Sequence, residues 1–322
     1  MPYPRSIAAA LLFAAGGCAP ENTLSPQKAP EEEALPSPYL AEETDTTDVV
    51  VLSPDQVQVG IESVLSEMLG LDPSLIFDAQ DEAFAAGDGE CPLVYDTYVT
   101  LYGYYYWYAT CEASNGASFD GYAYYNRMYE VDYGTYTYKD YGYFYGLTDI
   151  RTADGQRYEQ TGSAYFYDID YYASANRYLA WTVAGDFIWT GEDHEDDWLG
   201  ADVSMQMNGY TYQYDSGATL MYVNGTLGGL DGEFDSASFN KVFAMDAAMG
   251  NTCPEPGGTI SIRDGSTGEW YDVDFQGPKY WGAGTFPPDC DGCGSVYHRG
   301  EYLGQACPNL DGMLTWEGRP WR

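Results

Sequence analysis

The chain has 322 residues, 45% of them hydrophobic, which is enough for a sizeable core. With 50 acidic and 13 basic side chains its formal net charge is −37 at pH 7. This charge excludes nucleic acid and anionic membrane surfaces as partners. Its simplest role is to keep a tyrosine-rich surface in solution.

The N-terminal segment, residues 1–17, has the pattern of a secretory signal peptide. Arg5 precedes an apolar run from Ile7 to Ala15, which is too short to span a bilayer permanently. The stretch AAGGC resembles the lipobox of bacterial lipoproteins. This resemblance implies export, lipidation of Cys18 and attachment to a membrane through that lipid. Ala19 follows in place of the Asp that often retains lipoproteins in the inner membrane, so the resemblance favours the outer membrane.

Two helices are predicted behind a linker. Residues 18–50 are rich in Pro, Glu and Thr and predict a disordered acidic tether. Within residues 51–89, Ser53-Pro54-Asp55 is typical of a helix start, and this helix should end at Gly70. A second, shorter helix is expected from Asp72 to Phe84. The first helix carries an apolar stripe that we expect to pack on the rest of the domain, formed by Val57, Ile61, Val64, Leu65 and Met68.

Residues 90–322 predict an all-β domain. Aromatic and β-branched residues alternate with small or polar ones, and no helical pattern separates them. The expected turns are Asn115-Gly116, Asp154-Gly155, Asn208-Gly209, Asn224-Gly225, Asp231-Gly232 and Asp264-Gly265. We therefore predict an antiparallel meander of roughly ten to fourteen strands, which should form a curled sheet, a sandwich or a barrel.

The chain contains 33 tyrosines, and the densest group lies between Tyr95 and Tyr145. Strand alternation places several of them on shared faces, namely Tyr102, Tyr104, Tyr106, Tyr108, Tyr141, Tyr143 and Tyr145. One core cannot hide them all, so we expect some of these rings to bind a partner, either a neutral glycan or another envelope protein. The simpler interpretation is that tyrosine fills the sheet because it has a high strand propensity.

Six further cysteines form an even set, typical of disulfides in an exported protein: Cys91, Cys111, Cys253, Cys290, Cys293 and Cys307. A hairpin that turns at Arg299-Gly300 would pair Cys293 with Cys307 and leave Cys253 for Cys290. Cys91 and Cys111 suit a hairpin with its turn near Gly103. A redox or zinc site at the CxxC of residues 290–293 is the alternative. The segment from residue 253 to 321 resembles the C-terminal modules of uncharacterised exported lipoproteins, which implies only a cysteine-stapled β terminus.

The sequence predicts no catalytic residue and no cofactor other than calcium. An acidic stretch surrounds His194 and offers Glu192, Asp193, Glu195, Asp196 and Asp197 as calcium ligands, although a solvated acidic loop is the simpler interpretation. His298 should be a half-exposed strand residue. We expect a non-catalytic binding or structural protein of the cell envelope. The alternatives are a secreted polysaccharide hydrolase with paired carboxylates and a calcium-dependent surface adhesin.

Overall fold

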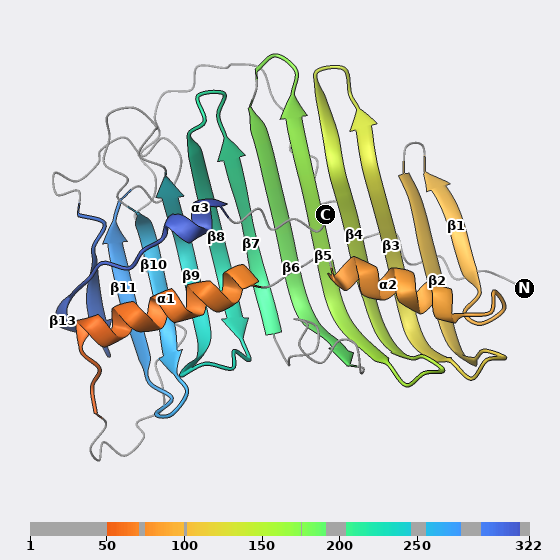
Figure 1. The fold of residues 1–322 in the computed structure, drawn as a ribbon, viewed down its shortest axis with the longest axis horizontal. Coiled ribbons are helices and arrows are strands. Elements are labelled where there is room, and N and C mark those ends of the chain that lie inside the picture. The colour runs from red at the N-terminus through yellow and green to blue at the C-terminus, as the bar shows by residue number, and fades with distance from the viewer. Residues whose placement is uncertain are drawn as a thin grey trace, which may run out of the picture. The chain divides into compact units, whose positions relative to one another are not determined.

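The computed structural model describes residues 50–70, 75–99, 102–174, 176–190, 204–245, 256–277 and 291–315. Within these residues, thirteen strands form one open antiparallel sheet whose spatial order is the order of the chain (Figure 1). The predicted all-β meander is therefore confirmed, and of the three expected forms the curled sheet is observed. The strands are β1 (Val94–Val99), β2 (Tyr102–Glu112), β3 (Ser118–Asp132), β4 (Tyr136–Arg151), β5 (Arg157–Tyr171), β6 (Arg177–Thr190), β7 (Ser204–Gln213), β8 (Thr219–Gly228), β9 (Phe234–Met245), β10 (Gly257–Asp264), β11 (Trp270–Gln276), β12 (Gly294–His298) and β13 (Glu301–Ala306).

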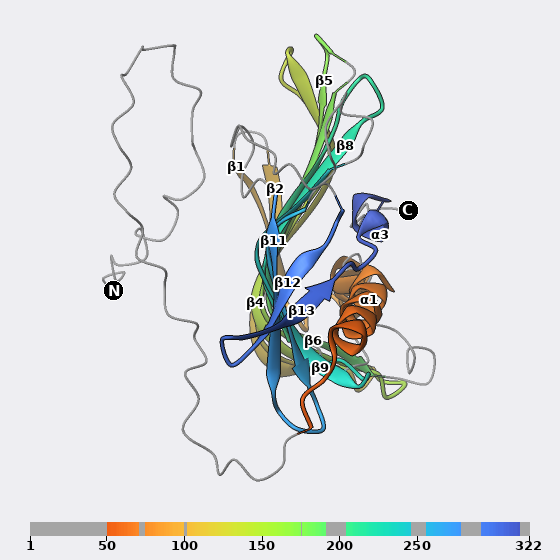
Figure 2. The same cartoon turned by 90° about the vertical axis from the view of Figure 1, so that its left-hand side faces the viewer.

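Three described helices, α1 (Pro54–Gly70), α2 (Leu75–Ala86) and α3 (Asp311–Thr315), lie on the same side of this sheet (Figures 1 and 2). We call this side the covered face and the opposite side the open face. Figure 2 shows the sheet curved around the side that carries the helices. The main core lies between the helices and the covered face.

Helix α1 begins with a reciprocal cap. The Gln56 backbone N–H donates to the Ser53 hydroxyl at 3.4 Å, and the Ser53 N–H donates to the Gln56 side-chain oxygen at 2.9 Å. The whole apolar stripe of this helix is buried. Gly60 allows the helix to lie close to β9, because a Cβ there would come within 2.5 Å of the Phe234 ring.

Helix α2 is joined to the sheet by both apolar and polar contacts. The fully buried Phe77 ring lies 5.7 Å from Phe166 and 5.9 Å from Tyr125. The Tyr125 hydroxyl donates to Asp81 at 2.7 Å. Because these contacts reach β3 and β5, the helix is fixed across several strands of the covered face.

Two of the predicted turns are wrong. Asn208-Gly209 lies inside β7 and Asn224-Gly225 lies inside β8, where the two asparagines are register partners. These glycines serve close packing instead. A Cβ on Gly209 would come 2.6 Å from the Trp181 ring, and one on Gly225 would come 2.0 Å from the Gln206 carbonyl oxygen.

Glycines also permit a close backbone approach at the middle of the sheet. Gly162 in β5 and Gly185 in β6 are register partners with φ of 132° and 145°. A Cβ on Gly162 would lie 2.0 Å from the Ala184 carbonyl oxygen, and one on Gly185 would lie 1.9 Å from the Thr161 carbonyl oxygen. Glycine kinks of this kind allow a sheet to bend.

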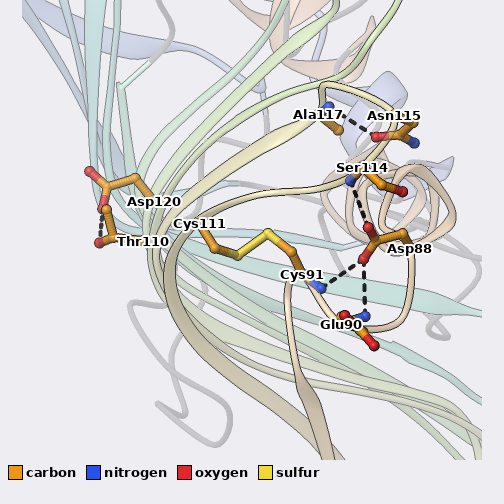
Figure 3. Close-up of a disulfide and its surroundings, with 9 residues drawn as sticks. All are labelled: Asp88, Glu90, Cys91, Thr110, Cys111, Ser114, Asn115, Ala117 and Asp120. Atoms are coloured by element: carbon orange, nitrogen blue, oxygen red, sulfur yellow. Dashed lines mark hydrogen bonds between the residues drawn. A yellow bond between two sulfur atoms is a disulfide. The ribbon is translucent and has the colours of Figure 1, made fainter.

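The first disulfide, Cys91–Cys111, joins the segment just before β1 to β2, with a Cα–Cα distance of 6.0 Å (Figure 3). Beside it, the Asp88 carboxylate accepts hydrogen bonds from the backbone N–H groups of Glu90, Cys91 and Ser114. Together they fasten the end of α2 to the first edge of the sheet. Strands β1 and β2 form the expected hairpin, in which Val99 pairs with Tyr102, next to Gly103.

The second disulfide, Cys293–Cys307, joins β12 to the end of β13. Both observed pairs match the prediction, whereas Cys253 and Cys290 lie outside the described residues. The two disulfides indicate a protein that folds outside the cytoplasm. Among the described helices, none has the length and apolar character needed to cross a membrane.

Candidate binding face

The open face begins with a row of tyrosines that crosses the first four strands. Tyr95, Tyr106, Tyr124 and Tyr145 are successive register partners on β1 to β4. Their ring centroids lie 5.1, 5.7 and 6.4 Å apart, and the first three rings are stacked with interplanar angles of 17° and 18°. We call this row the tyrosine ladder. Since cross-strand partners share a face, the pairing register alone aligns these rings.

Three more side chains extend the ladder into a patch. Tyr108, Tyr122 and Leu147 are register partners on β2, β3 and β4, one pleat away from the ladder. Tyr108 is 80% exposed, and Tyr124 and Tyr145 are 45% and 43% exposed. The ladder patch, meaning these three residues and the four of the ladder, therefore offers aromatic area to solvent.

Ring stacking decides what the ladder presents. In stacked rows the inner rings cover one another's faces, so their outer edges and hydroxyls remain for a partner. The Tyr122 hydroxyl donates to the Tyr145 hydroxyl at 3.4 Å. This hydrogen bond, with a contribution from burial, raises the pKa of Tyr122 above its ordinary value. The patch is thus a neutral surface of aromatic edges and phenolic hydroxyls.

A second group of tyrosines on the open face is packed more tightly. This inner tyrosine cluster spans β5 to β8 and the residue after β7, and comprises Tyr165, Tyr167, Tyr178, Tyr210, Tyr212, Tyr214 and Tyr222. Four of its members surround the buried Leu220, Phe243 and Met245. Burial raises the pKa of Tyr178 and Tyr210, and raises that of Tyr214 to about 12. The inner tyrosine cluster is a small core on the open side, whereas the ladder patch faces solvent.

The open face becomes polar toward the last strands. Ser261 on β10 donates to Asp272 on β11 at 2.6 Å, and Thr259 donates to Asp274 at 3.0 Å. Ser238 on β9 continues this row as the register partner of Ser261. The side chains of these cross-strand pairs hydrogen-bond to one another and contribute no aromatic area. The ladder patch is therefore the main exposed aromatic region of the described face.

The structure brings some of the predicted binding residues together and separates others. Tyr106, Tyr108 and Tyr145 belong to the ladder patch, as expected for one face. Tyr143 lies beside the inner tyrosine cluster, with its ring 6.5 Å from Tyr165. Tyr141 lies where the pairing of β4 with β5 shifts register. Two further residues are placed by their backbone pairing alone: Tyr102 opposite Val99 and Tyr104 opposite Thr97.

Sequence reasoning missed Tyr95, Tyr122, Tyr124 and Leu147 as members of the patch. Tyr122 and Tyr124 alternate along their strand, so the signal was present. What the sequence lacked was the register that places them against Tyr145. Cross-strand neighbours follow from pairing, and pairing is a tertiary property.

Other predicted sites lie outside the described residues. These are the lipidation site Cys18 and the calcium candidates Glu192, Asp193, Glu195, Asp196 and Asp197. Within the described ranges, no group of three or more His, Cys, Asp or Glu side chains is gathered in the way a metal would require.

His298 differs from its expected half-exposed position. It lies buried on the covered face, where its Nε2 is 2.8 Å from Glu269 Oε2 and its ring stacks on Tyr271 at 4.8 Å. The Arg299 guanidinium also bonds Glu269. Arg299 and His298 together hold the pKa of the Glu269 carboxyl below its usual range. The reason for the difference is alternation, because His298 shares its face with the buried Val296.

None of the protein families, curated proteins or solved structures with which the chain was compared matches it. The functional inference therefore rests on the chemistry of the open face. That face offers exposed aromatic area and phenolic hydroxyls, and the protein that carries it has a strongly negative net charge.

Proposed function

We propose that this protein is a lipid-anchored envelope protein, held in the outer membrane through Cys18, that binds a neutral glycan on its ladder patch without cleaving it. The observation that carries the proposal is the row of stacked, solvent-facing tyrosines on the sheet face opposite the described helices. The disulfides support an extracytoplasmic setting, and the lipobox-like AAGGC supports the anchor.

A neutral glycan suits the patch for three physical reasons. Its C–H surfaces pack against the exposed Tyr108 ring, and its hydroxyls pair with the phenolic hydroxyls. Tyrosine loses little side-chain entropy on contact, which favours it in binding surfaces. The net charge of −37 repels polyanionic polymers and leaves neutral ones unaffected.

The carboxylates beside the patch favour binding over hydrolysis. Asp120 accepts a hydrogen bond from the Thr110 hydroxyl at 2.8 Å, and Asp149 is held by Arg157 at 3.2 Å. A glycosidase needs one free carboxylic acid and one carboxylate across the scissile bond. These two carboxylates are engaged with partners on neighbouring strands, so the surface supports recognition.

Affinity electrophoresis in gels containing neutral polysaccharides tests the binding. The protein should be retarded, and Tyr108→Ala should weaken the affinity by about tenfold, equivalent to about 1.4 kcal/mol. Tyr302→Ala is the matched control, because Tyr302 is 59% exposed on β13, far along the sheet from the patch. Equal loss in both variants, or no retardation by any neutral polymer, contradicts the proposal.

The anchor is tested separately with radiolabelled palmitate in cells. Cys18→Ser should abolish labelling and release the protein from the membrane fraction. Density-gradient separation of inner and outer membranes then locates the unmutated protein. Labelling that persists in Cys18→Ser would show that the lipobox interpretation is wrong, without affecting the glycan test.

A further inference from the structure

Three tyrosines of the ladder patch meet at one point between β3 and β4. The rings of Tyr122, Tyr124 and Tyr145 lie 5.9 to 6.4 Å from one another, centroid to centroid. The hydroxyl oxygens of Tyr122 and Tyr145 are 3.4 Å apart. The ortho carbons of a phenol are next to the carbon that bears the hydroxyl. This contact therefore brings the ortho carbons of these two rings into the same small region of the surface.

We propose that Tyr122 and Tyr145 form an oxidative crosslinking site, at which a dityrosine bond joins β3 to β4 on the open face. Each phenol loses one electron and its hydroxyl proton and becomes a phenoxyl radical. The two radicals couple through one ortho carbon each, and the two displaced ring hydrogens return to the oxygens. The oxidant is hydrogen peroxide used by a haem peroxidase, and it takes up the two electrons and two protons as it forms two waters.

The hydroxyl contact distinguishes this pair from Tyr95 and Tyr106, whose stacked rings lie closer, at 5.1 Å. Exposure distinguishes it from the tyrosines of the inner tyrosine cluster. Tyr145 is 43% exposed, and Tyr124, in ring contact with both partners, is 45% exposed, so a radical formed at either reaches the pair directly. Tyr210 and Tyr222 lie closer, at 5.2 Å, but both are half-buried in the inner tyrosine cluster, whereas in the proposed pair only Tyr122 is half-buried. An oxidant that acts from solvent meets the ladder patch first.

The position of the bond gives it a structural consequence. The two observed disulfides lie at the ends of the sheet, at β1–β2 and β12–β13, whereas β3 and β4 are joined by hydrogen bonds along their whole length. A carbon–carbon bond there would survive reductants that open the disulfides. The crosslink would fix the register of the two strands that carry the centre of the ladder patch.

The experiment treats the purified full-length protein, at low concentration, with hydrogen peroxide and a haem peroxidase. We expect dityrosine fluorescence and a peptide pair that contains Tyr122 and Tyr145 and has lost two hydrogen atoms. Tyr145→Phe keeps the ring but has no hydroxyl, so this peptide pair should be lost. The control is Tyr172→Phe, in which the peptide pair should be kept. Tyr172 is likewise exposed, at 55%, but its hydroxyl contacts Thr137 and not a tyrosine of the ladder patch.

Three outcomes would overturn the proposal. The first is an undiminished dityrosine yield in Tyr145→Phe, and the second is crosslinking only between separate chains. The third is a bond between Tyr124 and Tyr145 where the proposal places one between Tyr122 and Tyr145. Thermal unfolding of the untreated Tyr145→Phe protein must match the unmutated protein, so that lost crosslinking is not confused with lost folding. The result is independent of glycan binding, which is measured on untreated protein.

Discussion

The two faces of the sheet use the same residue type for opposite purposes. On the covered face Tyr125 and Tyr158 are buried, and their hydroxyls bond Asp81 and Glu82 of α2. On the open face Tyr108 carries its ring into solvent. The difference follows from the position of each residue along its strand, since alternate residues point to opposite sides. Tyrosine content therefore does not identify a binding surface until the covered face is known.

The comparison is most strongly tested by removing one large side chain from each face. Phe77→Ala empties the contact between α2 and the covered face and should cost about 3–5 kcal/mol of unfolding free energy. Tyr108→Ala removes an exposed ring and should cost within about 0.5 kcal/mol. Urea unfolding followed by tryptophan fluorescence measures both. Similar losses in the two variants would mean that the open face is packed against something as tightly as the covered one.

The bend of the sheet is tested at glycine. Gly162→Ala forces a residue with a Cβ into φ of 132° and toward a carbonyl oxygen 2.0 Å away. The backbone conformation alone should cost about 1–3 kcal/mol, and the clash should add to it. Gly116 is the control, because its φ is 93° and no atom lies within 4 Å of a Cβ there. Gly116→Ala should therefore lose less stability in urea than Gly162→Ala, and the reverse order would remove Gly162 as a point of close approach.

Much of this fold could be predicted from local patterns. The start and end of α1 follow from Ser53-Pro54 and Gly70, and the hairpin around Arg299-Gly300 correctly pairs Cys293 with Cys307. These features depend on residues close in the sequence, where capping and turn chemistry decide the structure.

The remainder depends on register and packing between distant residues. Asn224-Gly225 has the signature of a turn, yet it lies in mid-strand, where glycine is required because the backbone of Gln206 on the neighbouring strand comes too close for a Cβ. His298 is buried because its strand lies against the core. The ladder patch itself required knowledge of which residue faces Tyr145. The sequence indicated that tyrosines would be exposed, but their grouping is set by pairing along the sheet.

Alkaline pH should act on the inner tyrosine cluster. Free tyrosine ionises near pH 10, whereas burial raises the pKa of Tyr178 and Tyr222, and raises that of Tyr214 to about 12. Their contribution to stability is complete below pH 10. Between pH 10 and the higher folded-state pKa, the unfolded chain loses protons that the folded chain keeps, so stability falls as pH rises.

Urea unfolding between pH 9 and 12 measures this fall, and phenolate absorbance reports the ionisation. Tyr214→Phe removes one titrating hydroxyl and should make the decline of stability with pH shallower. A decline as steep in Tyr214→Phe as in the unmutated protein would mean that Tyr214 ionises equally in the folded and unfolded chain. The small core around Leu220 and Phe243 would then not shield it.

The smallest expected difference concerns single hydroxyls on the two faces. Tyr158→Phe removes a donor that bonds both Glu82, at 3.0 Å, and Gln156, at 2.8 Å, beneath the end of α2. This should cost about 1 kcal/mol, the usual net value of a hydrogen bond in a folded protein, and little more, because Glu82 is exposed and can turn to water. Tyr108→Phe removes a hydroxyl that is already in solvent, so its unfolding free energy should not change measurably. If the two substitutions prove equal in urea unfolding, the hydroxyls of the covered face do not help to hold α2, and the faces differ only in how much ring area they bury.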